Sequence, residues 1–549
     1  MGRALGSGTL LVLLLLDPGT VAQTVVDPQL RVDDVVSGVG LSTTLAFIGD
    51  DDFLVLQKET GRVRRVLGGT LLPAPVLDVN VHFQGERGLL GIAPDPGFVN
   101  NRHVYLYYTE SPAGDTFDEQ VIPLGNRVYR YTWDGSALVA PELILDLPVT
   151  PGPAHNGGII AFGPDDRLHA VVGDLGRSGQ LENVPAGPEP DDTAVILRIT
   201  SAGAALPDNP FFDPTDASNP LNRYLAYGVR NSFGMAFDPV TGDLWSTENG
   251  PNSYDEVNRV EPGTNSGWRQ IMGPDSRDPQ NQGDLWLAPG ATYSDPEFSW
   301  STPVGPTAVL FVKSPKLGCD LLHDALVADF NCGQIYHFEL NGARDAFQFQ
   351  DAELQDLVAD NTTDPCATEL GEPIFGVGFN AITDMKTGPD GRIYVLRILD
   401  GRVMRIGPEP GAVTDVDGDE VDDACDCDPS DPAAFGTPLE VPSVRVSGVP
   451  TNLGWDSQSV ETGDGTVHDV VSGELSLLLA EAGFDSACTL AAGVMESRVT
   501  DARADPPAGD GYFYLVRARN SCADGTFGDG TDPANARGDL DLLPPSVCP

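Results

Sequence analysis

The chain has 549 residues, of which 41% are hydrophobic, and its 81 Asp and Glu residues outnumber 32 Lys and Arg residues to give a formal net charge of -49. This length is too great for one hydrophobic core, so two or three domains are expected. The negative charge excludes nucleic acid and anionic membrane surfaces as partners and favours divalent cations. The acidic excess also serves solubility in a salty environment, which is compatible with cation binding.

Residues 1–22 have the features of a secretory signal peptide. Arg3 supplies positive charge, residues 10–16 form a short apolar run, and residues 20–22 offer a small-residue cleavage site. The sequence therefore predicts a secreted protein, either extracellular or periplasmic. No later stretch reaches the roughly 20 apolar residues that a membrane helix needs, so no membrane insertion is expected.

One unit recurs along residues 30–408: an apolar strand, a turn rich in Asp, Pro and Gly, and a second apolar strand. Its six copies begin at Thr44, Leu89, Ile159, Met235, Phe311 and Asp384. Repeated strand hairpins at such intervals predict an all-β fold with a six-bladed β-propeller, whose radial closure protects the sheet edges. The alternative, a series of separate β-sandwiches, does not require the same hairpin six times.

The third copy follows His155, which is a candidate general base, and ends at Asp174. Gly157 and Gly158, close behind the histidine, would allow the backbone to approach a ligand. Taken alone, a histidine beside two glycines is equally well a simple loop residue. Its neighbours in other copies favour the functional interpretation.

These neighbours stand at equivalent loop positions of other copies. Arg230 and Asn231 precede the fourth copy, Gly250 and Pro251 follow its second strand, and Glu86 precedes the second copy. In a propeller such loops converge on one face. A base, a cation able to stabilise an oxyanion, an amide and exposed carbonyls would then surround one substrate.

Residues 409–435 form an acidic linker. Five aspartates occupy positions 1, 3, 5, 9 and 12 of a loop with the spacing of an EF-hand-type calcium site, and these are Asp415, Asp417, Asp419, Asp423 and Asp426. Glu420 stands at position 6, where an EF-hand has glycine, so we expect a different turn, with Gly418 supplying the flexibility. The stretch resembles a thrombospondin type 3 calcium repeat, which implies a structural role. A merely solvated acidic linker is the alternative.

Residues 436–549 contain short alternating strands, which predict a β-sandwich accessory domain of the fibronectin type III kind. His468 lies within one of these strands and is expected to pack rather than to bind a ligand.

The 8 cysteines of an exported chain predict disulfides. Cys319 and Cys332 bracket a predicted strand pair and are candidates for a local bridge. The C-terminal region holds three more, Cys488, Cys522 and Cys548. One of these three is a candidate partner for Cys425 or Cys427 in the linker, whereas Cys366 has no evident partner.

Four stretches together resemble one known family. In chain order they are GERGLLGIAPDPGF, HNGGIIAFGPDDRLHAVVGD, YGVRNSFGMAFDP and ENGPNSYDEVNRVEPGTNSGW. In this order and spacing they are similar to the soluble PQQ-dependent glucose/sorbosone dehydrogenases, also called aldose sugar dehydrogenases, over residues 35–407. The resemblance implies a six-bladed propeller that oxidises an aldose-type sugar at C1 to a lactone and passes electrons to an external acceptor.

The resemblance also implies a role for each candidate residue. His155 matches the general base, and Asp174 matches an acidic residue near it. Arg230 and Asn231 match residues that contact the cofactor, and Glu86 matches a polar residue lining the same pocket. The family's calcium, which holds and polarises the cofactor, is bound by backbone carbonyls. The matching positions are Gly250 and Pro251.

Three positions depart from the family. Its members bind the carboxylates of PQQ with a lysine and two arginines, and the matching positions here are Asn331, Ala381 and Thr383. Unpaired carboxylates in a closed pocket would cost on the order of several kcal/mol. Lys386 and Arg397 are candidates to replace the missing cations. The departures motivate a second hypothesis, a non-catalytic propeller that binds a glycan or a protein, similar to hedgehog-interacting proteins.

Overall fold

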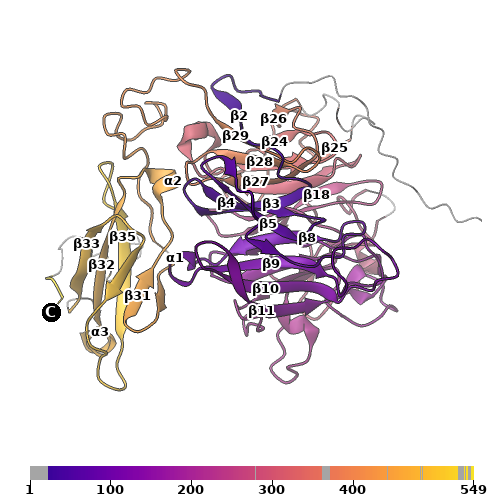
Figure 1. The fold of residues 1–549 in the computed structure, drawn as a ribbon, viewed down its shortest axis with the longest axis horizontal. Coiled ribbons are helices and arrows are strands. Elements are labelled where there is room, and N and C mark those ends of the chain that lie inside the picture. The colour runs from indigo at the N-terminus through magenta and orange to yellow at the C-terminus, as the bar shows by residue number, and fades with distance from the viewer. Residues whose placement is uncertain are drawn as a thin grey trace, which may run out of the picture.

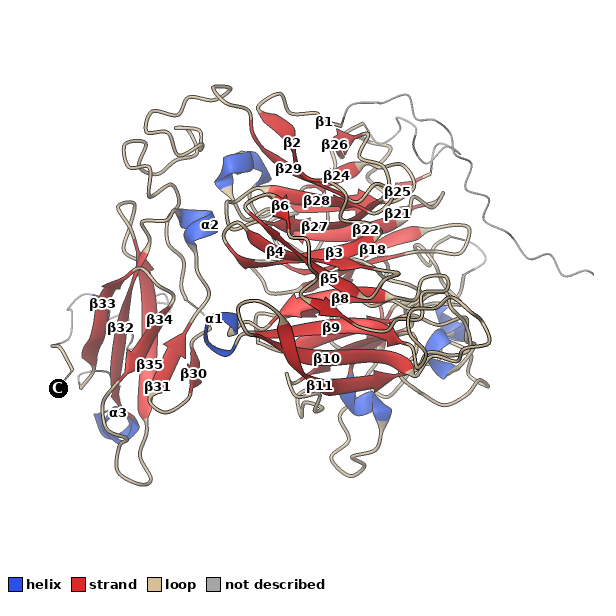
Figure 2. Cartoon of the chain, in the orientation of Figure 1, coloured by secondary structure: helices blue, strands red, loops and turns tan. Residues whose placement is uncertain are grey.

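The computed structural model describes residues 23–548 except for 278–279, 361–365, 367–370, 442, 482–483, 485, 529–536, 538–539 and 542–545. The predicted signal peptide, residues 1–22, lies outside the described residues. Strands make up most of the regular structure, as six sheets followed by two smaller ones (Figures 1 and 2). The all-β prediction is confirmed.

Five of the first six sheets begin with one of the predicted hairpins, and the copy predicted from Phe311 supplies the second and third strands of the fifth sheet. The first sheet contains β3 (Ser42–Gly49), β4 (Asp52–Gln57), β5 (Arg62–Leu67), β6 (Thr70–Leu71) and β7 (Leu77–Asp78). The second contains β8 (Leu89–Pro94), β9 (His103–Glu110), β10 (Gly125–Trp133) and β11 (Leu138–Leu147). The third contains β12 (Ile160–Phe162), β13 (Leu168–Val172), β14 (Val195–Ile199), β15 (Tyr224–Tyr227), β19 (Thr264–Asn265) and β20 (Thr292–Tyr293).

The fourth sheet contains β16 (Met235–Phe237), β17 (Leu244–Glu248), β18 (Asp255–Val260), β21 (Phe298–Trp300) and β25 (Val358–Ala359). The fifth contains β22 (Pro306–Phe311), β23 (Ala325–Asp329), β24 (Ile335–Phe338), β26 (Ile374–Val377) and β1 (Thr24–Val25). The sixth contains β27 (Ile382–Thr387), β28 (Ile393–Arg397), β29 (Arg402–Pro408) and β2 (Leu30–Val36). The fifth copy, predicted to begin at Phe311, begins earlier in the structure, because its first strand, β22, ends at Phe311.

The six sheets form a closed ring. The first strand of each sheet contacts the first strand of the next, in the order β3, β8, β12, β16, β22, β27, and β27 returns to β3. The N-terminal strand β2 completes the last sheet by pairing antiparallel with β29, so that Leu30 lies opposite Pro408. A propeller closed in this way leaves only short sheet edges.

The sheets pack face to face around the ring. Strands β13, β17 and β23 are buried at every residue, because neighbouring sheets cover both of their faces. Tyr105 of β9 and Val172 of β13, for example, belong to one buried cluster that joins two sheets. This packing provides a rigid scaffold for the loops at the ends of the strands.

Helical structure is sparse. Its elements are α1 (Phe98–Asn101), α2 (Ser459–Thr462), α3 (Leu475–Glu481) and the 3₁₀ turns η1 (Gln180–Glu182), η2 (Pro220–Arg223), η3 (Gln282–Asp284), η4 (Pro315–Leu317) and η5 (Cys319–Leu321). In the part of the chain that the structure describes, none of the helices is long and apolar enough to cross a bilayer.

The C-terminal region contains two three-stranded sheets beside the propeller (Figure 1). One is made of β30 (Arg445–Ser447), β31 (Thr451–Gly454) and β34 (Arg498–Asp501), and the other of β32 (Val467–Glu474), β33 (Cys488–Val494) and β35 (Tyr512–Arg519). Leu453 and Val470, one from each sheet, share a hydrophobic cluster. His468 is 2% exposed and its ring centroid lies 5.2 Å from that of Trp455, which confirms that it packs. The fibronectin type III assignment stays a prediction.

All eight cysteines are paired, as Cys319–Cys425, Cys332–Cys366, Cys427–Cys522 and Cys488–Cys548. The prediction of a link from the linker to the C-terminal region is confirmed by Cys427–Cys522. The predicted bridge between Cys319 and Cys332 is wrong. These residues lie before and after β23, and a five-residue strand places its ends roughly 13 Å apart, beyond disulfide reach.

Candidate functional site

The candidate base and its acidic neighbour form a hydrogen-bonded pair. His155 Nδ1 lies 2.6 Å from Asp174 Oδ1, and the carboxylate is almost fully buried. Because an ionised carboxylate only accepts hydrogen bonds, Nδ1 carries a proton, and in the neutral imidazole the lone pair is then on Nε2. The imidazole is therefore held in the tautomer that can accept a proton at Nε2.

Local backbone geometry fixes the pair. His155 precedes β12 and Asp174 follows β13, so two adjacent antiparallel strands place them at the same end of the third sheet. His155 itself has a positive φ of 57°. At Gly157, whose φ is 62°, a Cβ would lie 2.6 Å from Val171 O, so only glycine fits there.

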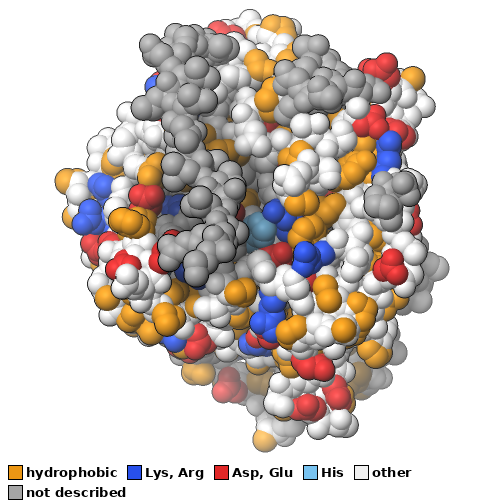
Figure 3. All heavy atoms as spheres, turned by 90° about the vertical axis from the view of Figure 1, so that its right-hand side faces the viewer, with side chains coloured by type: hydrophobic (Ala, Val, Ile, Leu, Met, Phe, Trp, Pro, Cys, Tyr) orange, Lys and Arg blue, Asp and Glu red, His pale blue; other side chains and the backbone are white. Residues whose placement is uncertain are grey.

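Glu86 joins the pair to two further sheets. Its Oε2 accepts from His155 N at 2.6 Å and from Asn231 Nδ2 at 3.0 Å. Glu86 precedes β8 and Asn231 precedes β16, so residues from the second, third and fourth sheets meet at this point. The predicted convergence of equivalent loops is thus present in the structure. Figure 3 shows the corresponding end of the molecule, where a hollow contains a histidine with basic and acidic side chains around it.

Arg230 brings a half-buried guanidinium to the same group. Its Nη1 donates to Asn249 O at 2.6 Å and to Gly250 O at 3.1 Å, and its backbone N donates to Glu248 Oε1. Burial lowers the pKa of Arg230, and the nearby carboxylates of Asp174 and Glu248 oppose that shift. An arginine nevertheless remains cationic, so the site keeps a positive charge.

Two buried atoms of this site have no partner among the described residues: Arg230 Nε and Asn231 Oδ1. Asn231 is only 3% exposed. Buried polar atoms are normally satisfied, so an unpaired donor and an unpaired acceptor side by side in the sequence indicate a place for a polar ligand.

Several residues of the site were missed by the sequence analysis. Trp268 Nε1 donates to Asp174 Oδ2 at 2.7 Å. Asp255 is 1% exposed, accepts from Gly250 N at 2.8 Å, and has a pKa that burial raises to about 6. Lys58 Nζ donates to Gly85 O at 2.8 Å, next to Glu86. A tryptophan or lysine in a polar loop is not marked by any hydrophobic periodicity. Trp268 is, however, the last residue of the family-like stretch ENGPNSYDEVNRVEPGTNSGW.

The three positions that match the basic residues of the family carry no cationic side chain in this chain. Ala381 is buried, Thr383 Oγ1 donates to Ser42 O at 3.1 Å, and Asn331 Nδ2 donates to Pro303 O at 3.4 Å. The two candidate replacements are paired elsewhere, Lys386 with Asp384 at 2.8 Å and Arg397 with Asp400 at 3.2 Å.

The acidic loop gathers three of its five predicted ligands. Ligand oxygens of Asp415, Asp417 and Asp419 lie within 4.8 Å of one another, whereas Asp423 and Asp426 are outside this group. Asp419 is 8% exposed, and its Oδ2 and that of Asp417 have no partner among the described residues. Burial, reinforced by neighbouring carboxylates, raises the pKa of Asp419 to about 6. Like charges this close disfavour one another unless a cation is bound.

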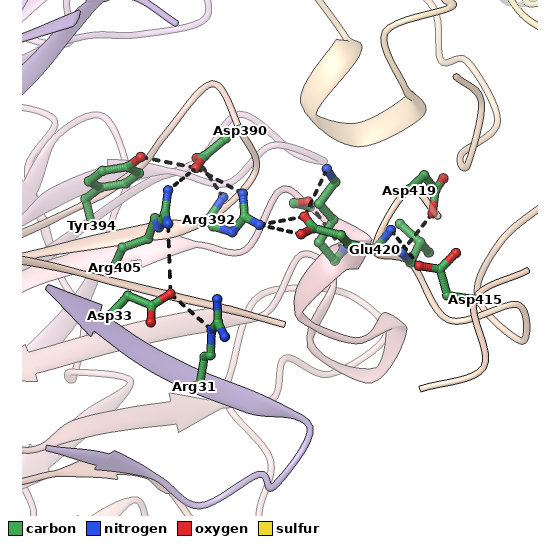
Figure 4. Close-up of polar contacts among 12 residues, drawn as sticks. Arg31, Asp33, Asp390, Arg392, Tyr394, Arg405, Asp415, Asp419 and Glu420 are labelled. Atoms are coloured by element: carbon green, nitrogen blue, oxygen red, sulfur yellow. Dashed lines mark hydrogen bonds and ion pairs between the residues drawn. The ribbon is translucent and has the colours of Figure 1, made fainter. Parts of the chain in front are cut away.

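The turn of this loop differs from the prediction in one respect. Gly418 has the expected left-handed conformation, with φ 90°, but Glu420 is left-handed as well, with φ 73°. The reason is an external clamp, because Arg392 Nη2 holds both oxygens of Glu420 at 2.7 and 2.6 Å (Figure 4). Lys316 Nζ lies 3.8 Å from the same carboxylate.

The clamp continues into the propeller. Arg392 contacts Asp390 at 3.3 Å, Arg405 lies 3.5 Å from Asp390, and Arg405 lies 3.9 Å from Asp33 of β2 (Figure 4). The acidic loop is therefore connected through alternating charges to the strand that closes the ring.

The propeller brings together an imidazole–carboxylate pair, a half-buried guanidinium and an amide with an unpaired oxygen at one end of its strands, which is an arrangement suited to an enzyme active site. The family model for Glucose / Sorbosone dehydrogenase matches residues 41–405, more than half of the chain. The chain belongs to this family and is an oxidoreductase that acts on a sugar.

Named relatives agree with this assignment. The chain is 29% identical to Quinoprotein glucose dehydrogenase B of Acinetobacter calcoaceticus over 259 residues, 44% of this chain and 52% of that protein. It is 26% identical to Aldose sugar dehydrogenase YliI of Escherichia coli over 372 residues, 66% of this chain and 89% of that protein. The solved structure of the PQQ-bound aldose sugar dehydrogenase of Streptomyces coelicolor aligns with a TM-score of 0.51 and 25% identity, covering 69% of this chain and 98% of that chain.

Proposed function

We propose that this chain oxidises an aldose-type sugar at C1 to a lactone, with PQQ and calcium as cofactors and an external electron acceptor. The observation that carries the proposal is the His155–Asp174 pair, 2.6 Å apart, beside a guanidinium and an amide with unpartnered buried atoms. The names of the relatives support the choice of cofactor and substrate class.

The residues of the chain have defined tasks in this reaction. His155 Nε2 takes the proton of the anomeric hydroxyl, and Asp174 stabilises the imidazolium that results. PQQ, when bound, supplies the acceptor for the hydride. Removing the proton at one fixed atom lowers the barrier because base and substrate are already oriented.

The residues present fit the reacting end of the cofactor. Arg230 Nε and Asn231 Oδ1 are buried without partners among the described residues. The Nε donor could pair with an oxygen of a quinone, and the Oδ1 acceptor could pair with a hydroxyl of the sugar. Gly250 and Pro251 would supply carbonyl ligands to calcium, the former while also accepting from Arg230 Nη1. At the opposite end, positions 331, 381 and 383 supply no cation, so we expect weaker cofactor binding than a charged anchor would give.

Reconstitution tests the proposal. The purified protein is incubated with PQQ and calcium, and dye reduction is followed with a panel of aldoses. His155→Ala should lower kcat by at least about a hundredfold, because a positioned base contributes this much or more. His337→Ala is the matched control, since His337 also contacts an aspartate, Asp324 at 2.9 Å, but on β24. No turnover by the wild type, or equal turnover by His155→Ala, contradicts the proposal.

Titration with PQQ, followed by absorbance, separates the enzyme from the non-catalytic alternative. Stoichiometric binding supports the dehydrogenase, and no binding at any concentration supports a propeller that has kept the fold and lost the cofactor. The variant Arg230→Met should weaken binding, because it removes the half-buried cation of the site.

The domain organisation that we propose is a signal peptide at 1–22, a propeller at 30–408, a calcium-binding linker at 409–435 and a β-sandwich accessory domain at 436–549. Strands β2 and β29 lie at the proposed propeller limits, whereas β1, which pairs with β26 of the fifth sheet, lies before residue 30. Secretion is supported by the signal-like leader and by four disulfides, which persist in oxidising compartments.

A further inference from the structure

Both oxygens of Asp174 are occupied. Oδ1 contacts His155 Nδ1 at 2.6 Å and accepts from Gly176 N at 2.7 Å, whereas Oδ2 accepts from Trp268 Nε1 at 2.7 Å. The indole N–H is thus the side-chain donor on the oxygen that faces away from the histidine. Because both oxygens accept hydrogen bonds, the carboxylate plane cannot turn without breaking a charge-assisted hydrogen bond.

The same tryptophan contacts the cation of the site. The guanidinium carbon of Arg230 lies 5.2 Å from the centroid of the Trp268 ring, a distance at which cation and ring attract. Asp174 N also donates to Arg230 O at 2.9 Å. Trp268 therefore touches both groups that flank the candidate base, through its N–H on one side and its ring face on the other.

Trp268 is itself held by a buried amide network. Asn183 and Asn265 are fully buried and exchange hydrogen bonds through their side-chain amides at 2.8 and 2.7 Å. Asn183 Nδ2 also donates to Trp268 O at 2.8 Å, and Trp268 N donates to Gly228 O at 3.1 Å. Gly228 has to be glycine, since a Cβ would lie 2.2 Å from Asn265 Oδ1. Such networks make a loop rigid when every member is satisfied.

We propose that Trp268 is a positioning residue for the acid–base pair. Its indole N–H fixes the Asp174 carboxylate in the plane that orients His155, and its ring keeps Arg230 beside them. The role rests on the proposed dehydrogenase function, in which His155 accepts the proton. Trp268 acts through Asp174 and is not assigned a contact with the sugar.

Kinetics of Trp268→Phe test the role. Phenylalanine keeps an aromatic ring near Arg230 and removes the N–H donor together with part of the indole ring. We expect kcat to fall about tenfold to a hundredfold, the value of a hydrogen bond to a charged group, while KM for the aldose and the affinity for PQQ stay unchanged. Trp455→Phe is the matched control, because the Trp455 indole N–H has no acceptor in the described structure and lies in the C-terminal sheets. A loss of PQQ affinity with unchanged kcat would overturn the proposal.

A double-mutant cycle separates positioning from general destabilisation. In an Asp174→Asn background, Trp268→Phe should cause no further loss of kcat, because the carboxylate that it orients is already absent. Full additivity of the two losses would show that Trp268 acts independently of Asp174 and would overturn the proposal.

A measurement on the cofactor-free protein makes the test independent of turnover. The hydrogen-bonded Nδ1 proton of His155 is assigned by proton NMR from its loss in His155→Ala. Its resonance should shift in Trp268→Phe and stay in place in Trp455→Phe. An unmoved resonance refutes the positioning role even if the enzyme is active. If the wild type oxidises no aldose but the resonance shifts, the proposed function fails and the positioning role stands.

Discussion

His169 is a buried histidine outside the site that makes the stability of the propeller depend on pH. It is 3% exposed on β13, its Nδ1 lies 3.1 Å from Arg167 O, and burial lowers its pKa to about 4. Asp165 opposes this shift and Arg198 adds to it. Since the unfolded pKa is about 6.5, His169 stays neutral in the folded state at pH values where the unfolded chain is protonated.

The sign of the effect follows from this difference. The contribution of His169 to stability is fully present above pH ~6.5 and is lost as the pH falls toward about 4. We therefore expect His169→Gln, which cannot titrate, to lose less stability than the wild type over that interval. Urea unfolding at several pH values measures the free energy of both proteins. Parallel losses in the two proteins would show that His169 has no part in the pH dependence.

The closing strand β2 is the element on which the ring depends. Leu30 is 7% exposed and packs in a cluster with Phe375 and Ile406 of two different sheets. Leu30→Ala should lower the free energy of unfolding by about 2–5 kcal/mol, the cost of a cavity in a core. Val26→Ala, at a residue that is 66% exposed in the same segment, is the control and should have little effect. Equal effects of both substitutions would mean that β2 does not hold the ring closed.

The acidic loop is the second element with a measurable role. Calcium bound by Asp415, Asp417 and Asp419 would stabilise the folded state by mass action, about 2.7 kcal/mol at a hundredfold excess over Kd. Adding a chelator should lower the melting temperature, and Asp419→Asn should remove this dependence. Asp422→Asn, outside the ligand spacing, should keep it. A melting temperature that does not respond to chelator contradicts calcium binding at this loop.

At the scale of the whole molecule, an ion pair joins the C-terminal sheets to the propeller. Arg445 of β30 holds both oxygens of Asp166, at 2.7 and 2.6 Å, and Asp166 lies in the turn after β12. His155 lies before β12, so the contact is at the other end of the strand from the candidate base. The C-terminal sheets are thus docked away from the site.

Arg445→Ala should loosen this docking without changing catalysis. We expect a larger radius of gyration in small-angle X-ray scattering and an unchanged kcat, because no residue of the site contacts Arg445. Asp456→Asn removes the other partner of Arg445, which belongs to the C-terminal region, and should leave the scattering unchanged. Identical scattering curves for the wild type and Arg445→Ala would show that other contacts fix the arrangement.

Much of this arrangement could be predicted from the sequence, because a repeated hairpin is a local signal. Five of the six predicted hairpins contribute the first two strands of a sheet, and the copy from Phe311 contributes the second and third strands of the fifth. The equivalent loops meet as expected at His155, Glu86 and Asn231. The short outer strands β19, β20, β21 and β25 could not be predicted, since two or three residues carry no periodicity.

What the sequence did not reveal depends on contacts between distant segments. Trp268 reaches Asp174 across 94 residues, and no local pattern marks such a pair. Cys319 pairs with Cys425 across 106 residues, and the closeness of Cys319 to Cys332 in sequence gives no sign of this distant partner. The conformation of Glu420 likewise follows from Arg392, which belongs to another part of the chain.

Cys425 is tied to the propeller through Cys319, and Cys427, two residues later, is tied to the C-terminal region through Cys522. A protease that cuts the linker before Cys425 or after Cys427 would leave the two halves covalently attached. Only the two peptide bonds that flank Asp426 would set them free without a reductant. The protein can therefore be cleaved at almost any other bond of this connection while its two halves stay covalently linked.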